Sequence, residues 1–251
     1  MASRKNGTAA RTRCEQCPLR NFKPFREFSS DELSFVSNFK TGELATDSGS
    51  TVLVEGAHSA HLYTILDGWA FRYKILEDGR RQILNYGMPG DLLGLQGSLM
   101  GEMQHSVEAL TPLTLCVFER DRITELFENQ PTLAYDVTWI ASREEAILDE
   151  HLLSVGRRSA LERAAYLLAF LQKKALSVNL VGENSGTLPI TQQHVADTLG
   201  LSIVHTNKTL RKLANRDLIH WLDRGCEVID ADGLAEIADW EFEVSTNRPF
   251  I

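Results

Sequence analysis

Short runs of apolar and β-branched residues, separated by turn sequences, occupy the chain between about residues 44 and 118. The runs 62–66, 69–73 and 81–86 alternate with Glu-Gly, Asp-Gly and Pro-Gly-Asp sequences. Many short strands joined by glycine-containing turns are typical of an antiparallel sandwich or barrel. The Asp78-Gly79 pair between two such runs predicts a β-hairpin. We therefore expect an antiparallel β-domain in this part of the chain.

A long helix is predicted for residues 128–156. Residues along one seam recur at steps of four and three, which alternate as far as His151: Leu133, Val137, Ile140, Glu144, Ile147, His151 and Val155. This heptad spacing is typical of a helix that packs against a second helix. A helix lying on its own β-domain would give a similar pattern, but the polar Glu144 and His151 favour a second chain. We therefore expect a dimer interface formed by Val137, Ile140, Glu144, Ile147, Leu148 and His151.

The most specific pattern lies between residues 191 and 213. Thr191 and Ser202 are typical N-cap residues, each placed before a short helical run. Ala196 is small enough for two helices to touch there, and Gly200 suits the left-handed turn between them. A small residue, a glycine four positions later and a capped basic helix together predict a helix-turn-helix. An ordinary helical hairpin of an enzyme is the alternative, but the hairpin wing predicted at 217–230 favours the first interpretation.

In a helix-turn-helix the second helix enters the major groove of DNA, and its first turns face the base edges. We expect base contacts from Val204, His205, Asn207 and Lys208. Asn207 can pair bidentately with adenine, and Lys208 can donate to guanine or to phosphate. The expected interface also includes residues that cap the helices or contact the phosphate backbone, namely Thr191, Gln192, Gln193, Ser202, Arg211 and Lys212.

Length and charge fit this picture of a two-domain protein. The chain has 251 residues, enough for two domains, and a formal net charge of −8. Lys208, Arg211, Lys212 and Arg216 form a local basic segment without an acid among them, and the local surface matters for DNA. No apolar run is long enough to span a membrane, and the polar residues 1–13, expected to be mobile, are not a secretory signal. We therefore expect a cytoplasmic protein, in which four cysteines do not form structural disulfides.

The order of these parts resembles the Crp/Fnr superfamily of transcription regulators. A glycine-punctuated β-roll carries the sequence Pro-Gly-Asp-Leu-Leu-Gly at 89–94, and a long helix and a winged helix-turn-helix follow. The resemblance covers about residues 14–238 and implies an α+β fold with a cyclic-nucleotide-binding-like β-roll and a dimerisation helix. It implies a palindromic promoter site as target and contacts with RNA polymerase. The expected division is 1–24 for the tail and cysteine pair, 25–127 for the sensor, 128–156 for the dimerisation helix and 157–251 for the DNA-binding domain.

The chain departs from the cyclic-AMP-binding branch of that family. Those members use a glutamate after the Pro-Gly-Asp turn for the ribose and an Arg-Ser pair for the phosphate. Gln96 and His105-Ser106 stand at these positions. A cyclic phosphate is best held by a charge-assisted arginine contact, so we expect no response to cyclic AMP. Fnr-type members read DNA with Glu, Ser and Arg where this chain has Val204, Asn207 and Lys208, which implies a different operator.

The cysteines resemble those of the oxygen-sensing Fnr-type branch, which ligates a [4Fe–4S] cluster. Cys14 and Cys17 match two N-terminal ligands and Cys116 matches the β-roll ligand, whereas the third N-terminal position falls on Lys23. The resemblance implies an iron–sulfur cluster held by Cys14, Cys17 and Cys116, with a fourth ligand that is not cysteine. Cys226, in the wing, is interpreted as an incidental thiol.

Other interpretations of the cysteines and of the signal stay open. Cys14 and Cys17 could form a thiol switch, with Cys116 as a buried core residue. The β-roll could hold a small metabolite or haem, for which His58, His61 and His105 are the available histidines. An enzyme is not expected, because no nucleophile-plus-base signature, phosphate loop or zinc motif is present.

Overall fold

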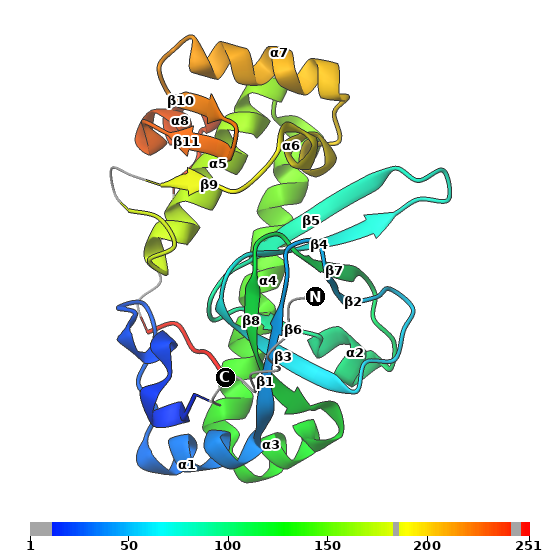
Figure 1. Ribbon diagram of the computed structural model, residues 1–251, viewed down its shortest axis with the longest axis vertical. Coiled ribbons are helices and arrows are strands. Elements are labelled where there is room, and N and C mark those ends of the chain that lie inside the picture. The colour runs from blue at the N-terminus through cyan, green and yellow to red at the C-terminus, as the bar shows by residue number, and fades with distance from the viewer. Residues whose placement is uncertain (1–11, 183–185, 242–246) are drawn as a thin grey trace, which may run out of the picture.

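The computed structural model describes residues 12–182, 186–241 and 247–251 (Figure 1). Most of the predicted mobile tail 1–13 lies outside these ranges, as does the centre of the polar loop 182–186. The described chain forms a β-rich sensor domain and a smaller helical domain, with one long helix, α4 (Pro131–Arg157), running from one to the other. None of the helices in these ranges combines the length and apolar character needed to cross a membrane.

The sensor domain is the antiparallel β-roll that the turn pattern predicts. Its strands are β1 (Lys40–Thr46), β2 (Thr51–Leu53), β3 (His61–Asp67), β4 (Ala70–Ile75), β5 (Arg81–Gly87), β6 (Leu92–Leu93), β7 (Ser106–Ala109) and β8 (Leu113–Glu119). They form two four-stranded sheets, in the orders β1-β8-β3-β6 and β2-β7-β4-β5. Ile65, Leu113 and Leu115 are fully buried in the sensor core. The predicted hairpin at Asp78-Gly79 joins β4 to β5.

Short helices surround the roll at its N-terminal end and in its loops. They are the 3₁₀ turns η1 (Cys14–Gln16), η2 (Pro18–Asn21) and η3 (Arg120–Arg122), and the helices α1 (Ser30–Phe39), α2 (Leu95–Met100) and α3 (Ile123–Asn129). A capping box, in which Ser29 and Glu32 exchange hydrogen bonds, starts α1. Phe39 packs on Phe118 of β8 and thereby holds α1 against the roll.

The helical domain begins at α5 (Ala160–Ser177), which a capping box between Ser159 and Glu162 starts. It continues with β9 (Thr187–Leu188), α6 (Gln192–Leu199), α7 (Ile203–Ala214), β10 (Ile219–Leu222), β11 (Gly225–Val228) and α8 (Ala231–Ala238). The three strands form one sheet in the order β10-β11-β9. Its β10–β11 hairpin is the predicted wing, and α5, almost fully buried, supports α6, α7 and α8.

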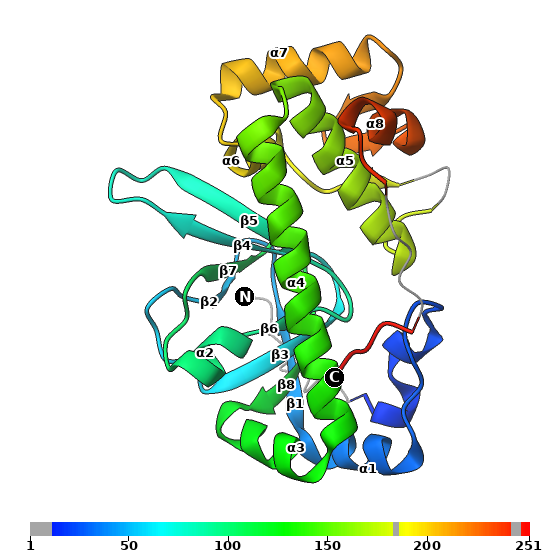
Figure 2. The same ribbon diagram turned by 180° about the vertical axis from the view of Figure 1, so that it is seen from behind.

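The end of the chain departs from the predicted division. Residues 157–251 were expected to form one DNA-binding domain, but Asn247–Ile251 lie against the sensor. Figures 1 and 2 show this C-terminal segment next to the first helices of the chain and far from α7. The sequence contains no periodic signal for this return, because it depends on contacts between residues more than 150 positions apart.

The predicted seam of α4 faces its own chain. Leu133 and Val137 are buried in the core, and Ile147 packs against that core. Glu144 binds Arg72 of β4, and His151 binds Tyr166 of α5. The two polar residues that favoured a second chain therefore both find partners within this one.

Candidate functional site

The helix-turn-helix has the local geometry that the sequence predicts. The Thr191 hydroxyl accepts a hydrogen bond from the backbone of His194 (3.1 Å), and the backbone of Thr191 donates to the His194 ring (3.2 Å). Ser202 caps α7 by accepting from the backbone of His205 (3.3 Å). Gly200 between the helices has φ +65, in the left-handed region that favours glycine. These interactions hold α6 and α7 at a sharp turn.

Helix α7 has a buried side and an open side. Its buried residues are Thr206, Thr209, Leu210 and Leu213. The open side carries most of the expected contacts, because Val204 is 61% exposed and His205, Lys208, Arg211 and Lys212 are exposed as well. In both overall views α7 lies at the end of the molecule opposite α1 and α3, where the sensor does not cover it. A basic, solvent-facing helix of this kind can enter the major groove of DNA.

Asn207 lies on the flank of α7 rather than on its open ridge. Its side-chain oxygen is buried and, within the described chain, has no hydrogen-bond partner. It lines a concavity of about 300 Å³ with Gln192, Leu210, Arg211, Ala214, Ile219 and Trp221. Bidentate pairing with adenine would therefore require the side chain of Asn207 to rotate outward. Trp221, on the wing, belongs to this surface and was not expected from the sequence.

The inner side of α6 is held by the sensor hairpin. Arg81 of β5 forms an ion pair with Asp197 (2.8 Å), and the Gln82 amide donates to the carbonyl of Thr198 (2.8 Å). The hydroxyls of Tyr86 and Thr198 are 2.9 Å apart. The expected phosphate contact Gln193 donates to Asp197 in this arrangement (2.6 Å). The sensor domain thus directly contacts α6, the first helix of the helix-turn-helix.

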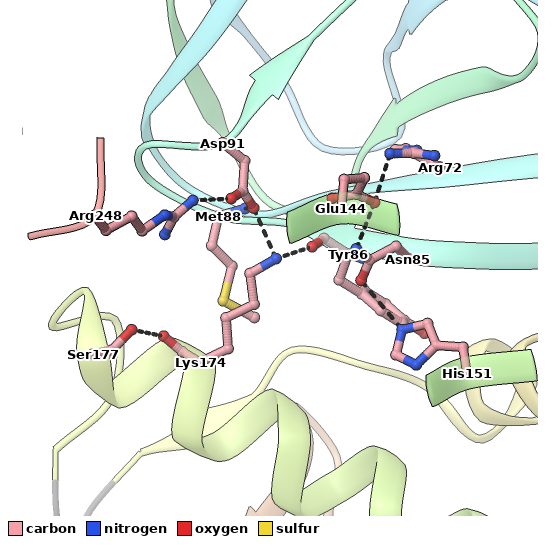
Figure 3. A network of polar contacts seen from close by, with 10 residues as sticks. All are labelled: Arg72, Asn85, Tyr86, Met88, Asp91, Glu144, His151, Lys174, Ser177 and Arg248. Carbon is pink, nitrogen blue, oxygen red and sulfur yellow. Dashed lines mark hydrogen bonds and ion pairs between the residues drawn. The ribbon is translucent and has the colours of Figure 1, made fainter. Parts of the chain in front are cut away.

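A buried ionic cluster joins the sensor to α5 and to the C-terminal segment (Figure 3). Asp91, in the Pro-Gly-Asp turn, binds Lys174 of α5 (2.8 Å) and Arg248. Lys174 also donates to the carbonyl of Tyr86 (2.7 Å). Burial alone would raise the pKa of Asp91, but the charges of Lys174 and Arg248 prevail and hold it at about 2. Asp91 is therefore ionised and binds two cations contributed by distant parts of the chain.

A second polar chain connects β4 and β5 to the junction of α4 and α5. Glu144 accepts hydrogen bonds from Arg72 (2.6 Å) and from the amide of Asn85 (2.8 Å). Asn85 faces His151 (3.4 Å), whose other ring nitrogen lies 2.7 Å from the Tyr166 hydroxyl. Burial, together with the charges of Lys174 and Arg72, lowers the pKa of His151 to about 4. His151 is therefore neutral near pH 7 and can act as a hydrogen-bonding link.

A cavity of about 130 Å³ lies between the β-roll and α4. Both residues at which the chain departs from the cyclic-AMP pattern, Gln96 and His105, line it. Burial, with Arg72 and Lys74 nearby, lowers the pKa of His105 to about 3, so the ring carries no charge for a phosphate. Of the cations that line this cavity, Arg72, Lys174 and Arg248 are paired with Glu144 or Asp91. The guanidinium of Arg143, which also lines it, lies over the Trp139 ring at 5.5 Å.

The cysteine pair and the β-roll cysteine converge, as the resemblance implies. Cys14, Cys17 and Cys116 line one cavity, whereas Lys23 is not part of its wall. Lys40 is part of the cavity wall. It forms an ion pair with Glu43 (2.6 Å), the residue opposite Cys116 in the β1–β8 register. Sequence reasoning missed Lys40 and Glu43, because a charged pair on a strand gives no spacing signal.

The thiols are not arranged as a ready metal site. Burial raises the pKa of Cys116 to about 12 and also raises that of Cys17, so both are protonated near pH 7. The cavity of about 20 Å³ has room for roughly one water molecule. In the parts of the chain that the structure describes, no three His, Cys, Asp or Glu side chains are placed to hold a metal ion. The donor set suits a cluster, but in this arrangement the residues do not fit one.

The remaining thiol and histidines lie apart from this cavity. Cys226 is buried on β11 of the wing, as expected for an incidental thiol. His58 is exposed and contacts the carbonyl of Gly101 (2.8 Å), and His61 is on β3. Of the three histidines considered for haem, His105 lines the β-roll cavity.

A β-roll sensor, a long helix and a winged helix-turn-helix with an open basic reading helix define a DNA-binding transcription regulator, not an enzyme. Residues 44–130 match the cyclic nucleotide-binding domain and residues 162–237 the Crp-like helix-turn-helix domain. The nitrogen fixation regulation protein FixK of Bradyrhizobium diazoefficiens is 30% identical over 217 residues, 86% of this chain and 90% of the relative. The chain belongs to the Crp/Fnr family of transcription regulators.

Two further similarities support the family and the fold. The transcriptional activator protein FnrL of Cereibacter sphaeroides is 28% identical over 223 residues, 88% of either chain. The solved structure of FixK2 from Bradyrhizobium japonicum superposes with a TM-score of 0.69 at 22% identity, covering 78% of this chain and 96% of that one.

Proposed function

We propose that the protein is a homodimeric regulator that binds a palindromic promoter site in the cytoplasm and there contacts RNA polymerase. The open side of α7, with Val204, Lys208 and Arg211 turned to solvent, is the observation that carries this proposal. Two copies of such a helix read two half-sites about one helical turn apart. Its test is titration of a promoter fragment with wild type and Lys208→Ala, in which the variant must lose affinity or base preference.

The surface proposed for dimerisation is the exposed side of α4. A second stripe runs beside the predicted seam and shares only the last residue, Val155, with it: Thr138, Ala141, Glu145, Leu148, Leu152 and Val155. It has heptad spacing and includes Leu152, which is 72% exposed. Leu148 belonged to the expected interface, whereas the other expected residues contact their own chain or lie beside this stripe. A stripe of this spacing, with apolar side chains at Ala141, Leu148, Leu152 and Val155, fits a second copy of the same helix.

Control through Cys14, Cys17 and Cys116 is the second part of the proposal. The convergence of the three thiols on one cavity supports a redox or oxygen signal at this site. The proposed cofactor is an iron–sulfur cluster held by these three cysteines, and loading it would require the cavity walls to move apart. Anaerobic reconstitution of wild type beside Cys116→Ala, with iron and sulfide analysis, tests this: equal iron content would exclude the three-cysteine site.

A thiol switch is the alternative for the same residues. Cys14 is the first residue of the 3₁₀ turn η1, and Cys17 directly follows its last residue. The backbone of Cys17 donates to the carbonyl of Cys14 (3.3 Å). Mass spectrometry of the oxidised protein would detect their disulfide while Cys116 stays reduced.

A ligand bound in the β-roll is the alternative source of the signal, but we expect no binding of cyclic AMP. The cavity lined by Gln96 and His105, at about 130 Å³, is smaller than the usual range of roughly 300–1,000 Å³ for ligand pockets.

A further inference from the structure

The C-terminal segment Asn247–Ile251 lies against the sensor. Its backbone pairs with the segment after η2, because Arg248 donates to the carbonyl of Pro24 (2.7 Å) and Arg26 donates to the carbonyl of Arg248 (2.9 Å). The Phe25 ring packs on the Pro-Gly-Asp turn, where Gly90 has φ +85 and a side chain would overlap that ring. The backbone of the segment is therefore held as an added strand would be.

The side chain of Arg248 ties this segment directly to the sensor and, through Asp91, to α5. It is 5% exposed, its guanidinium lies over the Phe25 ring at 5.1 Å, and it forms an ion pair with Asp91. The same carboxylate binds Lys174 of α5, on which the helix-turn-helix rests. Figure 3 shows Arg248 and Lys174 approaching Asp91 from different parts of the chain. When Arg248 leaves, Asp91 loses one of its two ion pairs and keeps the pair with Lys174.

The last two residues form part of the cysteine cavity. The Phe250 ring packs between Phe25 (5.1 Å) and Phe28 (4.7 Å), and Ile251 is buried, with its carbonyl accepting from the hydroxyl of Thr64. Phe250 and Ile251 both line the cavity that contains Cys14, Cys17 and Cys116. Both residues lie outside the strands of the roll, so the segment can leave without breaking a strand.

We propose that Arg248–Ile251 is an intramolecular plug, which shields the three sensor thiols and fastens the DNA-binding domain to the sensor through Asp91. Phe250 and Ile251 occupy space next to the thiols that a larger occupant would need, which accounts for the small cavity. Departure of the plug exposes the thiols and removes Arg248 from Asp91 in the same step. The plug acts on the free thiols, so it does not depend on whether a cluster forms.

The test is alkylation of the reduced, metal-free full-length protein with iodoacetamide, followed cysteine by cysteine by mass spectrometry. The compared chains are wild type, a chain truncated after Asn247, Ile251→Ala and Arg248→Gln. Arg248 is not in the wall of the cysteine cavity. Arg248→Gln therefore tests whether the ion pair with Asp91 controls the exposure of the thiols, and not merely whether removing part of the wall exposes them. Arg80→Gln is the matched control, because Arg80 forms an exposed ion pair with Asp78 on the hairpin.

We expect truncation to raise the alkylation rate of Cys116 by about tenfold or more, which corresponds to about 1.4 kcal/mol. Ile251→Ala and Arg248→Gln should raise it by smaller factors, and Arg80→Gln should leave it unchanged. Cys226, buried in the wing, is the internal control and should react at the wild-type rate in every variant. Equal rates at Cys116 in full-length and truncated chains would overturn the proposal. So would an equal rise at Cys226, since that would indicate loss of the fold.

Discussion

Single polar groups, at least partly shielded from solvent, hold the two domains together. Asp91, Glu144 and His151 each bind residues from another part of the chain. Removing one member leaves another buried without a partner, which is more costly than losing an exposed ion pair. The sequence identified Glu144 and His151 as unusual polar residues on a helix seam, but their partners lie too far away in sequence to be found by spacing.

Acid should destabilise the fold through His151. The unfolded chain takes up this proton near pH 6.5, whereas the folded chain does so only near pH 4, because burial lowers the pKa of His151. This contribution is fully present above pH 6.5 and is lost as pH falls from 6.5 towards 4. We expect the free energy of unfolding to drop by about 2 kcal/mol between pH 6.5 and pH 5 from this group alone.

Urea denaturation at several pH values measures that drop. His151→Gln should flatten the dependence on pH, and His58→Gln, at an exposed histidine, should keep it. An identical slope for His151→Gln and wild type would contradict the assignment.

Two residues of α7 should contribute to DNA binding in different ways. Arg211, exposed and basic, should bind phosphate, so Arg211→Ala should weaken all DNA sequences alike. The slope of log affinity against log salt should fall by about 0.9 for each phosphate that is no longer neutralised, or about 2 in a dimer. Asn207→Ala should instead reduce discrimination at one position in each half-site by roughly 1–3 kcal/mol.

Fluorescence anisotropy with matched and mismatched DNA, over a range of salt, separates the two effects. A sequence profile unchanged by Asn207→Ala would mean that the buried oxygen of Asn207 stays buried in the complex.

At the scale of elements, the sequence predicts what local rules control. The strands and turns of the roll, the caps at Thr191 and Ser202, and the turn at Gly200 follow from propensity and from the need to satisfy helix ends. The sequence predicts the heptad spacing of α4, but it does not predict which side of the helix faces its own chain. Two stripes one residue apart share the same spacing, and only the packing on β4, β5 and α5 decides which of them faces inward.

The exposed stripe of α4 should hold the dimer together. Leu152→Glu places a charge at its most exposed leucine, so we expect a shift to monomer in analytical ultracentrifugation with little loss of thermal stability. Leu99→Glu is the matched control, because Leu99 is 62% exposed on α2. A wild-type chain that is monomeric under DNA-binding conditions, or a Leu152→Glu dimer as tight as wild type, would refute this surface.

At the scale of the whole molecule, long-range contacts are the part that the sequence does not contain as a pattern. Cys14, Cys17 and Cys116 could be brought together only by resemblance to a family, and the cavity confirms that they meet. No family resemblance indicated the contacts of the C-terminal segment. Its contacts with Asp91, Phe25 and Thr64 arise from the tertiary fold alone.

Selection of binding sites from random double-stranded DNA tests most directly whether the protein reads DNA as a dimer through α7. We expect an enriched two-fold-symmetric site with half-sites about 10–10.5 base pairs apart, the spacing of one helical turn. Lys208→Ala should change the preference at a symmetric pair of positions, because Lys208 is on the open side of α7. Enrichment of an asymmetric site, or a Lys208→Ala profile identical to that of wild type, would contradict dimeric reading through this helix.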